Sequence, residues 1–115
     1  MRRGEIRAVD FEPVRGSEAS KIRPAVIVSN DAANATAARL GRGVITVVPV
    51  TSSVERVYPF QVVLRAGHTG LPHDSKAQAE QVRSVAVERI GRRLGTLPPA
   101  LIGQLDQALR LHLGL

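Results

Sequence analysis

The chain has 115 residues, a length that suits one compact domain, and we expect residues 1–115 to form a single domain. It contains no cysteine, which excludes disulfides and thiolate metal sites. The net charge is +6 and 14 of the 16 basic residues are arginine, which favours a polyanionic partner, although a GC-rich genome would produce the same arginine excess.

Hydropathy excludes a membrane protein built from helices. No stretch approaches the roughly 20 consecutive apolar residues that a membrane helix needs, and no apolar run follows the charged first five residues. We therefore expect a cytoplasmic protein. Only Phe11, Tyr58 and Phe60 are aromatic, so aliphatic side chains must form the core.

The first half of the chain alternates apolar, β-branched runs with polar or glycine-rich segments, a pattern typical of short strands. Strands are predicted at residues 4–11, 23–29 and 44–50, with a long polar loop at 12–22. Because proline lacks an N–H, Pro24 should begin its strand or lie at an edge, and Pro49 should mark a strand end or a bulge. The alanine-rich residues 30–40 predict a short helix, capped by Ser29 or Asn30 and ended by two glycines.

The second half is less regular. Residues 60–64 and 90–97 predict short strands, and the glycine and proline of residues 66–74 predict a loop. Residues 75–87 are ambiguous: their composition favours a helix, but the alternation of Ala77, Ala79 and Gln81 favours a strand. Residues 98–113 predict an amphipathic helix with one apolar stripe, formed by Leu101, Leu105, Ala108, Leu109 and His112 or Leu113. About six strands and two helices indicate a small barrel-like sheet with helices outside it.

Four segments together resemble the MazF/PemK/Kid family of toxins across essentially the whole chain. They are Gly4-Glu5-Ile6 with Val9-Asp10-Phe11, RPAVIVSN at residues 23–30, PVTS at 49–52 and EQVRSV at 80–85. The resemblance implies an SH3-like small barrel, mainly β with α, that forms a homodimer and cleaves single-stranded RNA without a metal or other cofactor. It also favours a strand within residues 75–87. One position departs from the family, because Arg7 stands where members commonly carry an aromatic residue.

The implied reaction is attack of a ribose 2′-hydroxyl on the adjacent phosphate, which gives 2′,3′-cyclic phosphate and 5′-hydroxyl ends and blocks translation. The protein then has to stabilise charge on phosphorus and move two protons. The resemblance places Arg23 and Thr51 at this centre. Arginine stays protonated up to pH ~12, so Arg23 is more easily a phosphate clamp that protonates the leaving 5′-oxygen than a base. The residues expected to hold RNA are Ser17, Glu18, Lys21, Ser52, Gln81 and Arg83.

Other constellations allow other chemistry. Without the resemblance, Arg23 reads as a surface cation and Thr51 as a turn hydroxyl. His68 and His73 could act as a base and an acid, or bind a metal with Asp74, but exposed loop histidines explain them more simply. Three acidic residues near the first strand, Glu5, Asp10 and Glu12, would suit a two-metal nuclease, and alternating exposed strand positions explain them as well.

Two other functions remain open for such a fold. A CcdB-like toxin binds DNA gyrase and cleaves nothing, but such chains typically end in Trp-Gly-Ile, whereas this chain ends in Leu113-Gly114-Leu115 and has no tryptophan. A non-catalytic nucleic-acid-binding module would usually carry aromatic stacking platforms, which three aromatic residues can hardly supply. The partner that the resemblance implies is an acidic, MazE-like antitoxin, whose charge would complement the basic chain.

Overall fold

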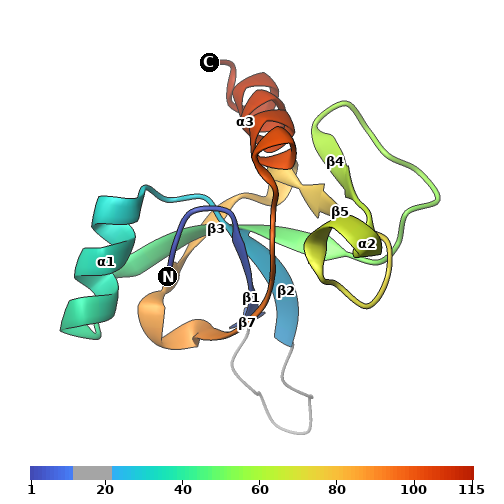
Figure 1. Cartoon of the computed structure of the whole chain (residues 1–115). Helices are drawn as coiled ribbons and strands as arrows, with labels where there is room; N and C mark the ends of the chain where they lie inside the picture. The colour runs from blue at the N-terminus through green and yellow to red at the C-terminus, as the bar shows by residue number, and fades with distance from the viewer. Residues whose placement is uncertain (12–21) are drawn as a thin grey trace, which may run out of the picture.

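The structure is a computed structural model that describes residues 1–11 and 22–115, so the predicted loop lies outside it except for Ile22. The described chain forms a strongly bent antiparallel sheet with helices around it (Figure 1). The strands are β1 (Glu5–Asp10), β2 (Ile22–Ile27), β3 (Val44–Thr51), β4 (Gln61–Leu64), β5 (Ser75–Gln78), β6 (Arg83–Ala86) and β7 (Ile90–Thr96). The helices are α1 (Asp31–Leu40), α2 (Ala66–Thr69) and α3 (Pro99–Leu113), with single 3-10 turns η1 (Ala79–Gln81) and η2 (Val87–Arg89).

Strand β3 organises the sheet, because it is paired along both of its edges. The strand order is β4-β5-β3-β2-β1-β7, and β6 pairs with the first half of β3 while β5 pairs with its end. Strands β6 and β7 are joined by η2, but β6 pairs with β3 whereas β7 pairs with β1 at the far end of the strand order. The sheet is therefore bent so that its end strand comes back towards β3. No pairing between β6 and β7 closes it within the described chain. The predicted barrel-like fold with a C-terminal helix is confirmed, with seven strands in place of about six.

The two prolines lie inside strands, which the sequence did not predict for Pro49. Pro49 is buried in β3 opposite Ala25 of β2, so the expectation of a strand end or bulge was wrong. On its other edge, β3 leaves β6 after Val47 and meets β5 at Val50, so a missing N–H is tolerated in this interval. Pro24 pairs with Ala8 of β1, but the ladder to β3 starts only at Ala25, so Pro24 does lie at an edge on that side.

Helix α1 begins and ends at the predicted caps, whereas α3 departs from its prediction in its last turn. The side chain of Asn30 caps α1 by accepting a hydrogen bond from the Ala33 N–H at 2.8 Å, and Gly41 ends it in the left-handed conformation. In α3, Leu105 and Ala108 are buried, but His112 and Leu113 are exposed, so the predicted apolar stripe was wrong for the last turn. That turn extends beyond the sheet, at the top of Figure 1.

Strands β2 and β3 are buried on both faces where they pair, which explains why they are nearly continuous apolar runs. Val26 and Val48 face a core that α3 covers with Leu105. Their neighbours Ile27 and Val47 face a second core, to which α1 contributes Ala37. Among the described residues, none of the helices is long and apolar enough to cross a membrane.

Candidate active site

A pocket of about 360 Å³ lies where β2 begins and β3 ends. The two predicted catalytic residues, Arg23 and Thr51, line it together with Ser52. Its other lining residues are Pro24, Val50, Leu71, Pro72, His73 and Ser75. The volume falls in the range of roughly 300–1,000 Å³ that is common for small-molecule sites.

The strand register explains why Arg23 and Thr51 meet. Strands β2 and β3 are antiparallel, and Ala25 pairs with Pro49. Continuing this register by two residues places Arg23 opposite Thr51. Because residues two apart on a strand point to the same face, the motif spacing in the sequence becomes a single site in space.

Thr51 keeps a proton that it can donate to a ligand. Its Oγ1 accepts a hydrogen bond from the Ser53 N–H at 3.2 Å, which uses an oxygen lone pair and leaves the hydroxyl hydrogen. Thr51 also pairs with Lys76 of β5, whose buried ammonium donates to the Arg56 carbonyl at 2.5 Å. This hydrogen bond fixes the position of the connection between β3 and β4, which begins directly after Thr51.

The opposite wall comes from the connection between β4 and β5, which the sequence predicted as a plain loop. It contains the short helix α2, so that prediction was wrong. The carboxylate of Asp74 accepts from the Ala66 N–H at 2.8 Å and pairs with Arg65 at 3.3 Å, and these two contacts close the connection into a compact turn. The Ala66 N–H, followed by Arg65, lowers the pKa of Asp74 below its ordinary range.

A glycine in β7 supports this turn from outside the pocket. A Cβ placed at Gly95 would overlap the carbonyl oxygen of Thr69, the last residue of α2. Gly95 lies inside β7 and lets the backbone of the turn pack directly on this strand. The position of Leu71, Pro72 and His73 in the pocket wall therefore depends on a residue 20 or more positions away in the sequence.

The structure separates the two histidines of this connection. His73 lines the pocket, whereas His68 lies in α2 and is absent from the lining residues. A metal site of His68, His73 and Asp74 is not formed, since the described residues contain no group of three such side chains that could hold a metal ion. The carboxylate of Asp74 is already engaged by Ala66 and Arg65.

The residues predicted to hold RNA are only partly brought to the pocket. Ser52 lines it, but Gln81 and Arg83 do not. Gln81 is exposed at the end of η1, and the guanidinium of Arg83 lies 5.3 Å from the centre of the Phe11 ring. The candidates Ser17, Glu18 and Lys21 lie outside the described residues.

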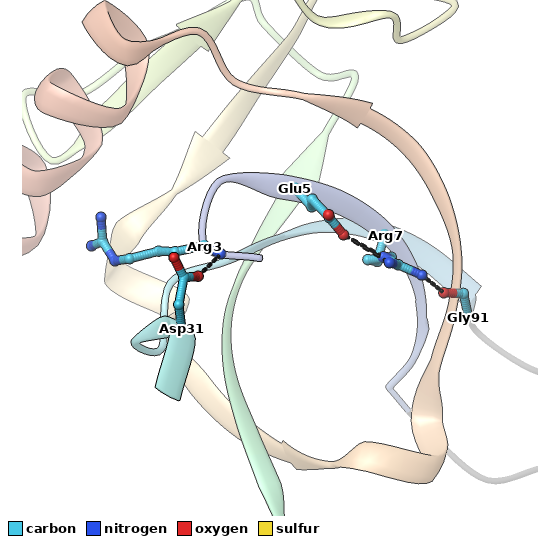
Figure 2. A network of polar contacts seen from close by, with 5 residues as sticks. All are labelled: Arg3, Glu5, Arg7, Asp31 and Gly91. Atoms are coloured by element: carbon cyan, nitrogen blue, oxygen red, sulfur yellow. Dashed lines mark hydrogen bonds and ion pairs between the residues drawn. The ribbon is translucent and has the colours of Figure 1, made fainter. Parts of the chain in front are cut away.

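Arg7, at the position where the family commonly has an aromatic residue, forms polar contacts within the fold (Figure 2). It donates to Glu5 Oε1 from Nε at 2.9 Å and from Nη2 at 2.7 Å, and to the Gly91 carbonyl at 3.1 Å. Burial raises the pKa of Glu5, but the hydrogen bonds and charge of Arg7 outweigh it, so the net shift is downward. The carboxylate of Glu5 is therefore paired with Arg7 of the same strand. This pairing removes one of the three carboxylates from which a two-metal site near β1 could have been built.

The sequence did not predict which residues form the pocket wall opposite Arg23 and Thr51. Ser75 and the apolar pair Leu71 and Pro72 line the pocket. His73 is exposed on a loop as predicted, and it also lines the pocket. The only local signal was the cluster of glycine, proline and histidine at residues 67–73, which marks an ordered turn as readily as a solvated loop. The contact of that turn with Gly95 has no sequence signature.

Comparison with known proteins agrees with this fold. Residues 2–113 match the family described as PemK-like, MazF-like toxin of type II toxin–antitoxin system. The chain is 66% identical over 115 residues to the protein named endoribonuclease MazF9 of Mycobacterium tuberculosis, covering all of this chain and 98% of that protein. It is 28% identical to endoribonuclease EndoA of Bacillus subtilis, covering all of this chain and 96% of that protein.

Solved structures of the same fold include toxins bound to antitoxins. A MazE–MazF crystal structure from Deinococcus radiodurans superposes with a TM-score of 0.80 at 28% identity, covering all of this chain and 96% of that one. An endoribonuclease in complex with its cognate antitoxin from a mycobacterial species has a TM-score of 0.76 at 25% identity, with coverage of 100% and 96%. Fold, pocket and similarity together define a small toxin domain. The chain belongs to the PemK-like, MazF-like family of toxins of type II toxin–antitoxin systems.

Proposed function

We propose that this chain is an endoribonuclease toxin that cleaves single-stranded RNA at specific sequences without a metal ion, with residues 1–115 acting as one toxin domain. The observation that carries the proposal is the meeting of Arg23 and Thr51 in one pocket. The 66% identical relative is itself named an endoribonuclease, which supports the same activity here. The pocket offers the guanidinium of Arg23 and the hydroxyl groups of Thr51 and Ser52, a set of donors that suits a phosphate better than a carbon substrate.

The proposed reaction uses the substrate's own nucleophile. The ribose 2′-hydroxyl attacks the neighbouring phosphorus, and the products carry a 2′,3′-cyclic phosphate and a 5′-hydroxyl. Arg23 holds the non-bridging phosphate oxygens, where negative charge develops, and protonates the leaving 5′-oxygen. Thr51 donates its hydroxyl hydrogen to a further phosphate oxygen, and Ser52 hydrogen-bonds the adjacent nucleotide. Cleavage of messenger RNA would block translation.

The partner that we propose is an acidic antitoxin of the MazE kind. The chain has a net charge of +6, and relatives of this fold are known in complexes with their cognate antitoxins. A flexible acidic segment that folds onto a basic surface gains both charge complementarity and buried apolar area. We further propose that the chain is a cytoplasmic homodimer. Its support is the exposure of large apolar side chains at the end of α3, where Leu111 and Leu113 are 59% and 53% exposed.

The test is RNA cleavage in EDTA with end-group analysis of the products. Wild type should cut and leave cyclic phosphate, while Arg23→Ala and Thr51→Ala should lose at least 100-fold in rate, the cost of removing one charge-stabilising donor. Arg39→Ala, which removes a cation from the exposed last turn of α1, serves as the matched control and should cut like wild type. Loss of cleavage in EDTA would overturn the metal-independent mechanism. Absence of any cleavage would overturn the enzyme assignment and favour a toxin that only binds its target.

A further inference from the structure

The pocket poses a problem of proton transfer that Arg23 and Thr51 do not solve. Removing the proton from a 2′-hydroxyl requires a group that is unprotonated near neutral pH. Guanidinium groups stay protonated, and threonine and serine hydroxyls are far weaker bases than an imidazole. Among the described residues that line the pocket, Arg23 and His73 are the ionisable ones, and imidazole is the side chain that exchanges a proton near neutrality.

We propose that His73 is the general base of the cleavage reaction, a role that rests on the proposed RNA cleavage. The 2′-oxygen forms a bond to phosphorus while its proton passes to the neutral imidazole. The bond between phosphorus and the 5′-oxygen breaks, and the 5′-oxygen takes a proton from the guanidinium of Arg23. Solvent then removes one proton from His73 and returns one to Arg23, so each turnover starts from the same protonation state.

The fold holds the backbone of His73 on both sides. Leu71 is 5% exposed and anchors the turn in the core. The Ser75 hydroxyl donates to the His73 carbonyl at 3.0 Å, and the Asp74 carboxylate accepts from the Ala66 N–H. His73 itself is exposed to the pocket, so its ring is able to meet a substrate. A rigid backbone with an accessible imidazole is the arrangement that proton transfer needs.

Among the described residues, the charged groups that bear on His73 come from β2 and from the β4–β5 connection. From β2, Arg23 shares the pocket. On the β4–β5 connection, the carboxylate of Asp74 accepts a hydrogen bond from the Ala66 N–H and forms an ion pair with Arg65. His68 lies on the same connection and lowers the pKa of Asp74 through a coulombic interaction. In the proposed complex a bound phosphate lies between Arg23 and His73. Arg23 neutralises the negative charge of this phosphate, and His73 accepts the proton of the 2′-hydroxyl.

The two histidines provide a matched pair of variants. His73→Ala should lower kcat by about 100-fold to 10,000-fold, the usual size of a general-base contribution, with little change in KM. In wild type, log kcat should rise with pH at unit slope on the acid side of the profile, and this slope should disappear in His73→Ala. His73→Gln keeps hydrogen bonding without titration and should fail equally, while added imidazole should restore part of the activity of His73→Ala. His68→Ala should match wild type in rate and pH profile.

Several results would overturn the role. If His73→Ala or His73→Gln cuts within about threefold of wild type, or the pH slope survives in His73→Ala, His73 is not the base. If only KM rises, His73 binds substrate as a cation. In each case Arg23→Ala remains inactive, so the proposed endoribonuclease function stands while this inference fails. If wild type cuts no RNA, both fail.

Discussion

Replacing Gly95 with alanine tests whether β7 positions the pocket wall. The new methyl group would overlap the carbonyl oxygen of Thr69 and lie 3.6 Å from the Gly70 Cα, so the contact is with backbone and no flexible side chain can move aside. Overpacking of this kind typically costs ~1–3 kcal/mol. For a domain of this size each kcal/mol corresponds to about 4 °C in Tm. We expect Gly95→Ala to lower Tm by roughly 4–12 °C.

The same displacement should reach the chemistry. The turn that Gly95 supports carries His73 into the pocket, and misplacing a catalytic group by about 1 Å can cost ~100-fold in rate. Thermal unfolding followed by circular dichroism gives Tm, and single-turnover cleavage below Tm gives the rate of the chemical step. Gly103→Ala is the matched control, because nothing lies within 4 Å of the Cβ that it adds on α3. It should stabilise α3 by about 0.5–1 kcal/mol and leave the rate unchanged. A Gly95→Ala protein as stable and as active as wild type would refute the link between β7 and the pocket.

Three further predictions concern the core, the Glu5–Arg7 pair and the charge. Leu105→Ala should lower the free energy of unfolding by about 2–5 kcal/mol in denaturant titrations, because Leu105 is the side chain of α3 that is fully buried in the core; a smaller loss would mean that α3 packs loosely. The lowered pKa of Glu5 stabilises the fold above the ordinary value of 4.5, and this contribution is lost as pH falls through the folded-state pKa. Wild type should therefore lose more stability than Glu5→Gln between pH 6 and pH 3, and equal losses in the two proteins would exclude the pair as an acid-sensitive contact. RNA affinity should fall about linearly in log–log plots against salt, and a flat plot would exclude phosphate contacts as the main source of binding.

The sequence predicted most elements because its local signals agree with the fold. The Asn30 cap, the alanine-rich α1 and the apolar runs of β2 and β3 each carry the pattern of the element that they form. The failures have a common physical cause. Pro49 is tolerated because β3 changes partners beside it, and α2 forms because Asp74 reaches back to Ala66. Both depend on contacts between segments that no local pattern records.

The site was predicted in the same uneven way. The resemblance to the family placed Arg23 and Thr51 at one centre, and the antiparallel pairing of β2 with β3 is the physical reason that they line one pocket. His73 could not be placed with them, since its distance from them depends on how a 10-residue connection folds between Leu64 and Ser75. Gln81 and Arg83 were expected near RNA, but η1 turns the chain before β6 and they do not line the pocket.

The pairing of β1 with β7 joins the beginning of the chain to its end. Glu5 pairs with Thr96, and the Arg3 guanidinium binds Asp106 at 2.6 Å. During synthesis such contacts cannot form until the residues of β7 and α3 have left the ribosome, and pairings so distant in sequence also slow folding. The turn that forms one wall of the pocket packs on Gly95 of β7, so it cannot reach its final position before β7 is in place. The wall of the pocket that carries His73 is therefore completed late in folding, after β7 has paired with β1.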